Sequence, residues 1–373
     1  MIKNLKSEIF RHLSNIPGWR TNLKIIVFES DDWGSIRMPS KQVFEKLKAA
    51  RVDLTSGDAL RYNLNDTMAT ADDLSALFQT LTSVKDKKGN SAVFTPISLV
   101  ANPDFEKIKA SHFQEYFYEP FTETLKKYQR EDAFTLWQEG INKRLFVPEF
   151  HGREHLNVQV WMRRLQHKDP NTLSAFEQGM WGFNNPGLIT YQAAFDLEYP
   201  EDIEYQKNVI KEGLAIFEKL HGYKATFFVP PNGPFNSQLE IPAFEGGIRY
   251  LSTSKLHKEP QGNGKYTKQL YWLGKKNKQG VRYITRNAFF EPSQPGKDWV
   301  NSCLNDISLA FKYHKPATIS THRLNYIGSL NPSNRDNGLK QLNQLLKEIT
   351  KKWSDVEFIT SAELGDLIAS SKK

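Results

Sequence analysis

The sequence lacks several features that would assign it to a narrow class of proteins. It contains one cysteine, Cys303, in 373 residues, which excludes an internal disulfide framework and a cysteine-based metal site. It has no apolar run of the about 18 residues that a membrane-spanning helix needs. The first residues, MIKNLKSEIFRHL, contain no long apolar stretch typical of a signal peptide. From these absences we expect a cytoplasmic protein with no transmembrane segment.

The composition is low in apolar residues but high in aromatic ones. Apolar residues make up 39% of the chain and aromatic residues 12%, including 24 phenylalanines. Aromatic surface of this kind suits flat ligands such as sugars. The net charge of +8 favours polyanionic or phosphorylated partners, but no basic motif with interleaved aromatic residues supports binding to nucleic acid. We therefore expect no nucleic-acid partner.

The most informative stretch is residues 23–35, LKIIVFESDDWGS. It begins with a short apolar run rich in β-branched side chains, which is typical of a strand buried on both faces of a parallel sheet. The run leads to Asp31 and Asp32, and in barrels and open α/β sheets ligands bind at such strand ends. Adjacent residues on a strand point to opposite faces, so both aspartates can serve one site only if the chain turns there. The Gly34 that follows permits a turn.

Similar runs recur along the chain and alternate with helical patterns. We expect strands at residues 92–100, 145–151, 188–191, 225–229, 248–253, 281–286, 317–321 and 356–359, and helices that include 204–221, 337–353 and 361–370. This order predicts an α/β fold, namely a distorted (β/α) barrel of seven or eight repeats in a single domain with loop insertions. We expect an N-terminal helical extension at residues 1–22 and the barrel at 23–373, with insertions near 104–143 and 255–280.

In such a barrel the carboxyl ends of the strands would gather polar residues at one rim. The residues at these ends are Asp31, Asp32, His151, Asn232, Asn287 and His322. His151 and His155 are four residues apart, so on the first turn of a helix they would share a face and grip one metal ion. A strand-end carboxylate as third ligand would leave open positions for water, as in catalytic zinc sites. His322 is a candidate proton shuttle near neutral pH.

These residues resemble the motifs of the polysaccharide deacetylase family, the chitin and peptidoglycan deacetylase type of carbohydrate esterase. The family's first motif, a strand followed by two aspartates, is matched at Asp31 and Asp32. Its His-x-x-x-His motif is matched by His151 and His155, and its last, a strand-end histidine, by His322. The resemblance implies a distorted (β/α) barrel with Asp31 as general base and His322 as general acid. It also implies that Asp32, His151 and His155 bind Zn²⁺ or another divalent transition metal.

The chain departs from the family pattern in ways that mark it as a divergent member. The third motif, an arginine followed by Pro-Pro-x-Gly, is only partly present, because Val229 stands where the family has the arginine that steadies the base. Arg286 and Arg153 are candidates to replace that arginine. Trp33 stands where the family has a glycine after the aspartates.

The resemblance and the residue types predict a metal-dependent hydrolase that removes N-acetyl or O-acetyl groups from a carbohydrate. The expected partner is therefore a carbohydrate substrate, and the positive charge suggests one that is phosphate-bearing or lipid-linked. Candidate substrate-binding residues at the strand ends and near the motifs are Trp33, Asn232, Arg286 and Tyr326.

Two other functions remain open at this point. One is a glycoside hydrolase, in which Glu149, Glu154 or Glu291 would act with Asp31 as a pair of carboxylates. The other is a non-catalytic barrel that binds a sugar or a metal and has lost the arginine at position 229.

Overall fold

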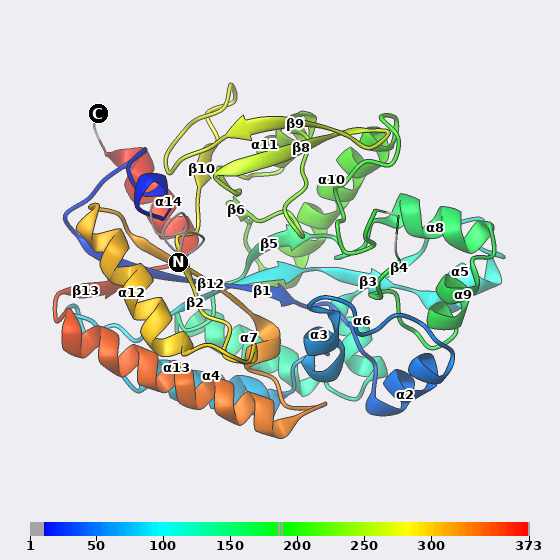
Figure 1. Cartoon of the computed structure of the whole chain (residues 1–373), viewed down its shortest axis with the longest axis horizontal. Coiled ribbons are helices and arrows are strands. Elements are labelled where there is room, and N and C mark those ends of the chain that lie inside the picture. Colours follow the sequence, from blue (N-terminus) through cyan, green and yellow to red (C-terminus); the bar gives the residue numbers. More distant parts are fainter. Residues whose placement is uncertain (1–10, 186, 188, 372–373) are drawn as a thin grey trace.

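The computed structural model describes residues 11–185, 187 and 189–371 (Figure 1). The first ten residues of the expected N-terminal extension lie outside the described residues, and within the rest of it residues 11–14 are helical. In the part of the chain that the structure describes, no helix combines the length and the apolar character needed to cross a membrane.

A curled parallel sheet forms the centre of the fold (Figure 1). Its strands are β1 (Lys24–Trp33), β2 (Phe94–Leu99), β5 (Glu149–Gly152), β6 (Phe227–Phe228), β7 (Tyr250–Ser252), β10 (Arg282–Ile284), β11 (Ala288–Phe289), β12 (Ala317–His322) and β13 (Val356–Phe358). The order is β10-β7-β6-β5-β2-β1-β12-β11, with β13 paired to the start of β1, and all these pairings are parallel. The outer strands β10 and β11 are consecutive in the chain, yet the described residues show no ladder between them. The expected α/β class and distorted barrel are confirmed.

Helices connect the strands and cover the outside of the sheet (Figure 1). They are α2 (Lys41–Ala49), α3 (Ala59–Asn65), α4 (Ala71–Thr82), α5 (Phe105–Ala110), α6 (Phe121–Lys127), α7 (Asp132–Asn142), α8 (Val158–Gln166), α9 (Pro170–Phe176), α10 (Asp202–His221), α11 (Glu240–Glu245), α12 (Trp299–Lys312), α13 (Pro332–Lys352) and α14 (Ser361–Ser370), with 3-10 turns η1 (Ser237–Leu239) and η2 (Arg323–Asn325). The helices expected at 204–221, 337–353 and 361–370 are thus confirmed as α10, α13 and α14.

Strand β1 shows how the sequence builds the two faces of the sheet. Ile26 and Phe28 belong to a core cluster with apolar side chains of α4, α12 and α13. Ile25 and Val27 belong to a different cluster inside the barrel, together with side chains of α14. Because side chains alternate along a strand, the next inward positions of β1 are those of Glu29 and Asp31. The interior of the barrel is therefore apolar near α14 and becomes polar towards the carboxyl ends of the strands.

One expected strand is wrong and several are shorter than expected, among them 225–229, 248–253 and 281–286, of which only β6, β7 and β10 form. Residues 189–192 form no strand, and residue 188 lies outside the described residues. The backbone instead turns, because the carbonyl of Thr190 accepts from the Ala193 N–H and that of Tyr191 accepts from the Asn157 N–H. In the segment 145–151, only the last part is strand β5, and Phe146 makes a single bridge to Phe94.

The two expected insertions contain secondary structure of their own. Residues 104–143 include α5, α6, α7 and strand β4 (Tyr118–Pro120), which pairs with β3 (Ala101–Pro103). Residues 255–280 include the antiparallel hairpin of β8 (Leu256–Gly262) and β9 (Lys265–Leu270). We propose that both segments are part of a single barrel domain at residues 23–373.

Candidate functional site

The carboxyl ends of the parallel strands border a cavity of about 1280 Å³. All the polar residues expected at these ends line it: Asp31, Asp32, His151, Asn232, Asn287 and His322. His155 and Arg286 line it as well. Residues from β1, β5 and β12 are thus brought to one place although they lie up to 291 positions apart, from Asp31 to His322.

Both aspartates reach this cavity because β1 is irregular where they occur. The pairing of β1 with β2 shifts by one residue between Ser30 and Trp33, which is the mark of a β-bulge. Asp32 lies within this bulge and has a φ of 75°, a left-handed conformation that is uncommon for a residue other than glycine. The bulge turns Asp32 away from the outward direction that strict alternation would give it. Strain of this kind often occurs at functional sites.

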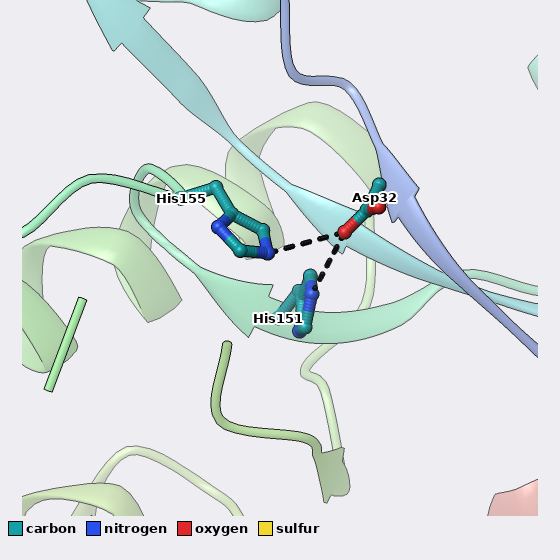
Figure 2. A group of neighbouring side chains, drawn as sticks. All are labelled: Asp32, His151 and His155. Atoms are coloured by element: carbon teal, nitrogen blue, oxygen red, sulfur yellow. Dashed lines mark ion pairs between the residues drawn. The ribbon is translucent and has the colours of Figure 1, made fainter. Parts of the chain in front are cut away.

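Asp32, His151 and His155 form a compact group of three side chains (Figure 2). Asp32 Oδ1 lies 3.4 Å from His151 Nε2 and 3.1 Å from His155 Nε2, and all three residues are buried. One ligand atom from each residue lies within 4.8 Å of the others. His151 lies on β5, but His155 lies in the loop before α8, so the expectation that both occupy one helical turn is wrong. The loop, and not helical periodicity, brings the second ring to Asp32.

The contacts of His151 are those of a residue that could bind a cation in this group. Its Nδ1 lies 2.6 Å from the carbonyl oxygen of Val229, which can only accept, so Nδ1 carries the proton. In the neutral ring, Nε2 then directs a lone pair at the carboxylate of Asp32, which is also an acceptor. Nε2 is buried and has no hydrogen-bond partner among the described residues. A metal ion between these atoms would satisfy both, and the backbone carbonyl would fix the ring in the required tautomer.

The electrostatics of the other two members fit the same interpretation. Burial opposes ionisation of Asp32, but positive charge around it, including that of His322, holds the pKa of this carboxyl well below the usual value. Burial lowers the pKa of His155 and thereby favours the neutral imidazole, which is the form that binds a metal. The group thus offers one carboxylate and two imidazole rings as ligands.

Asp31 is bound by an arginine that lies 255 positions away in the sequence. Arg286 lies in the segment between β10 and β11, and its Nη1 and Nη2 donate to the two carboxylate oxygens of Asp31 at 2.5 and 2.6 Å. Its Nε donates to Glu29 at 2.6 Å. Burial alone would raise the pKa of Asp31, but the charge and hydrogen bonds of Arg286 hold it below its usual value. Asp31 is therefore ionised near neutral pH and able to accept a proton.

His322, in contrast, is held in its protonated, positively charged form. Its Nδ1 lies 2.5 Å from Glu291 Oε1, and the other oxygen of Glu291 accepts from Arg61 and Asn325 at 2.9 and 3.0 Å. Burial disfavours the charged ring, but Glu291 outweighs it and the pKa of His322 rises to about 9. Its Nε2 lies 3.8 Å from Asp31 Oδ2. The cavity thus places a proton donor beside a proton acceptor.

Three of the expected substrate-binding residues have other positions or contacts. Trp33 is 1% exposed and packs in the core against Trp137 and Phe146, so it cannot stack on a sugar. Tyr326 is fully buried and its hydroxyl contacts that of Thr321. Both side chains point away from the cavity because large aromatic rings are the main filling of this core. The donors of Arg286 are engaged by carboxylates and Ser320. Asn232 is exposed and lines the cavity, and its role in binding stays a prediction.

The other candidate acids and the second candidate arginine lie elsewhere. Arg153 pairs with Glu154 and Glu212 and does not reach Asp31. Glu149 is buried and accepts from the backbone N–H groups of Thr226 and Phe227, while burial raises its pKa to about 8. Neither Glu149 nor Glu154 borders the cavity, and the carboxylate of Glu291 is occupied by His322.

The sequence interpretation missed two contributors to the site. Glu29 shares the guanidinium of Arg286, and its position two residues before Asp31 on a strand was the signal that could have found it. Arg37 lines the cavity, and its guanidinium lies 4.5 Å from the ring centroid of Tyr62. No local pattern in the sequence distinguishes Arg37.

Comparison with known proteins gives only distant matches. No protein-family model matches the sequence, and no curated protein matches it. Among solved structures, the chain is similar to a Parabacteroides distasonis protein provisionally assigned as a glycoside hydrolase/deacetylase, with 11% identity, a TM-score of 0.48, and coverage of 95% of this chain and 73% of that one.

Two further solved structures give comparable values. A Mycobacterium smegmatis protein provisionally assigned as a polysaccharide deacetylase is 10% identical, with a TM-score of 0.42 and coverage of 95% of this chain and 93% of that one. The 4-alpha-glucanotransferase from Thermococcus litoralis is 10% identical, with a TM-score of 0.46 and coverage of 94% and 41%. Two of these three structures carry a deacetylase description, and the chemistry of the present chain is inferred from its site alone.

Proposed function

We propose that this protein is a metal-dependent hydrolase that removes an acetyl group from a carbohydrate. The observation that carries the proposal is the meeting of Asp32, His151 and His155 in one cavity with an ionised Asp31 and a protonated His322. These are the groups that hydrolysis of an acetamide or acetate ester requires: ligands for a metal, a general base and a general acid.

The residues of this chain divide the reaction between them. When bound, a divalent cation such as Zn²⁺ would polarise the acyl carbonyl and bring the pKa of a water to about 7. Asp31, kept ionised by Arg286, accepts a proton from the attacking water. His322, kept protonated by Glu291, donates a proton to the departing nitrogen or oxygen of the sugar. Asp31 Oδ2 and His322 Nε2 lie 3.8 Å apart, so the base and the acid can act on the same bound group.

The support of Asp31 by Arg286 favours a catalytic over a non-catalytic barrel. The family arginine is absent at Val229, but a guanidinium reaches the base from another segment. A guanidinium at this position holds the pKa of Asp31 below its usual value, as the role of general base requires. The glycoside hydrolase alternative gains no such support, because Glu149 and Glu154 lie outside the cavity and Glu291 pairs with His322.

The test is release of acetate by purified protein from two substrates, N-acetylglucosamine oligosaccharides and O-acetylated xylan. The expected result is release from at least one, dependent on a divalent metal and lost in Asp31→Asn and His151→Ala. The exposed His167 serves as the control position, and His167→Ala should behave as wild type. Metal-independent release of reducing sugar would instead identify a glycosidase, and stoichiometric metal binding without any acetate release would contradict the proposal.

A further inference from the structure

Arg37 has no polar partner, although it lies in the wall of the cavity. Its buried Nε has no hydrogen-bond partner among the described residues, and no carboxylate of those residues forms an ion pair with it. Asp66 is one of the carboxylates whose charge Arg37 affects, but its oxygen accepts two hydrogen bonds from Arg323. Asp32 faces the two histidines. Arg37 is half-buried, and its buried Nε lacks the partner that polar groups removed from water normally have.

The other arginines around the site show what pairing looks like here. Arg286 binds Asp31 and Glu29, Arg61 binds Asp58 and Glu291, and Arg11 binds Asp306. In each case a carboxylate of the chain compensates the cation. Arg37 differs because no carboxylate among the described residues pairs with it. Its guanidinium lies over the ring of Tyr62, with the guanidinium carbon 4.5 Å from the ring centroid. This stacking fixes the plane of the guanidinium but leaves its edge available.

The charges that line the cavity are also out of balance. Its carboxylates are Asp31, Asp32, Asp58 and Asp306, each with a partner or in the metal group. Besides Arg37, the wall contains Lys255, whose Nζ contacts the hydroxyl of Ser14 at 3.1 Å, and Lys297, whose Nζ lies 3.9 Å from the ring centroid of Trp299. Neither lysine forms an ion pair with a carboxylate among the described residues, so three cations remain unpaired in the same cavity as the metal group.

We propose that Arg37, with Lys255 at a second position, binds an oxyanion of the substrate, so that the natural substrate is an acetylated carbohydrate carrying a carboxylate or a phosphate. The assignment of the anion to the substrate rests on the proposed deacetylase function. The anion site itself is inferred from the residues of the cavity alone. A planar fork of donors matches a carboxylate or phosphate through two parallel hydrogen bonds. Arg37 and Asp32 line the same cavity, so the anion would be bound in the cavity that also receives the acetylated sugar.

The position of Tyr62 gives this arrangement a link to catalysis. The ring centroids of Tyr62 and His322 lie 5.8 Å apart in an edge-to-face arrangement. The guanidinium of Arg37 lies over the face of the same Tyr62 ring. One side chain thus contacts both the anion-binding residue and the proposed general acid. We expect the bound anion to position the leaving group for His322, and not to take part in proton transfer.

The first experiment measures anion binding without turnover. Inorganic phosphate and glucuronate are titrated calorimetrically into metal-free wild-type protein, so that neither anion can act as a metal ligand. We expect at least one to bind, and to bind about tenfold or more weakly to Arg37→Ala, since a bidentate charge-assisted pair is lost. The preferred anion identifies the phosphate or the carboxylate as the recognised group. Binding that is absent for both, or that is equal in wild type and Arg37→Ala, overturns the proposal whether or not the protein releases acetate.

The second experiment measures specificity on matched substrates in the metal-loaded enzyme. We compare N-acetylglucosamine with its 6-phosphate, and neutral acetylated xylo-oligosaccharides with those that carry glucuronate. In Arg37→Ala we expect KM for the anionic member to rise about tenfold or more with a smaller change in kcat, and KM for the neutral member to stay unchanged. Lys340→Gln, an exposed charge change on α13, is the control and should alter neither. Equal effects of Arg37→Ala on neutral and anionic substrates would assign Arg37 a structural role and refute anion recognition, while deacetylase activity would stand.

Discussion

Arg286 joins Asp31 and Glu29, which lie two residues apart on β1, through a single guanidinium. The two bonds to Asp31 are 2.5 and 2.6 Å long, the carboxylate is buried, and the arginine side chain is 15% exposed. Two carboxylates and one cation share this part of the barrel, so its stability and the charge of the base depend on the same residue.

Replacement of Arg286 by methionine should therefore affect both stability and activity. It would leave two buried carboxylates without a counter-charge, and we expect a loss of about 3–5 kcal/mol in the free energy of unfolding. The pKa of Asp31 should rise, so the acidic limb of the activity profile should move to higher pH. Urea unfolding and a pH profile of kcat/KM measure the two effects. Arg286→Lys keeps the charge but not the fork, and should fall between wild type and Arg286→Met; a methionine variant as stable and active as wild type would refute this role.

The pair of His322 and Glu291 sets the alkaline limit of activity. With a pKa of about 9, His322 is protonated at neutral pH, and activity should fall as the pH rises through that value. Glu291→Gln removes the charge that raises this pKa, so the alkaline limb should move to lower pH. The limb remaining in place in Glu291→Gln would show that another group controls it.

The same shift predicts how stability depends on pH. The pKa of His322 is higher in the folded chain than its ordinary value of 6.5, so its contribution is complete below pH 6.5 and is lost as the pH rises through about 9. The pKa of Glu291 is lowered, so its contribution is present at neutral pH and is lost on acidification. Melting temperatures between pH 6 and 10 for wild type and Glu291→Gln should converge as the pH approaches the upper end of this range.

Removal of a metal ligand should weaken metal binding before it alters the fold. We expect wild-type protein to bind one divalent ion, and His155→Ala and Asp32→Asn to bind it about 100-fold or more weakly. Saturation at 100 times the dissociation constant should stabilise the wild type by about 2.7 kcal/mol. Calorimetric titration with Zn²⁺ and thermal melts with a chelator measure these effects. Retention of full affinity in both variants would place the ion elsewhere.

Trp33 should act as a core residue and not as a surface for sugar binding. Its indole N–H donates to the Ser30 hydroxyl at 2.9 Å inside the core. Trp33→Ala should lower the free energy of unfolding by about 3–5 kcal/mol, whereas Trp33→Phe should keep KM near the wild-type value. A rise of KM in Trp33→Phe without loss of stability would instead place the ring in contact with the substrate.

The fold was predictable from the sequence because its signals are local. The apolar runs identify parallel strands such as β1, β2 and β12, and the helical patterns identify α10, α13 and α14. The segment 188–191 was wrongly predicted as a strand because β propensity there is overridden by turn hydrogen bonds. Local preference decides an element only where tertiary contacts agree with it.

The site was predictable in its residues but not in its geometry. Polar strand ends identified Asp32 and His151, and the four-residue spacing from His151 identified His155, yet neither the bulge at Asp32 nor the loop that carries His155 has a pattern in the sequence. Arg286 bonds to a residue 255 positions away, and no spacing rule reports such a contact. The burial of Trp33 and Tyr326 was missed because an aromatic residue near a site looks the same in sequence whether it faces solvent or the core.

No ladder joins β10 to β11 among the described residues, and the short connection between them determines how Arg286 reaches Asp31. Unpaired strand edges often associate with other chains. Here the backbone between the two unpaired edges instead carries the long side chain of Arg286, which points into the barrel. Arg286 is the middle residue of the three that connect the two strands, so the length of this connection determines its reach. We expect deletion or insertion of one residue there to withdraw the guanidinium from Asp31 while Asp32, His151, His155 and His322 keep their positions. A change in this short connection could therefore remove or restore the counter-charge of Asp31 independently of the other residues of the cavity.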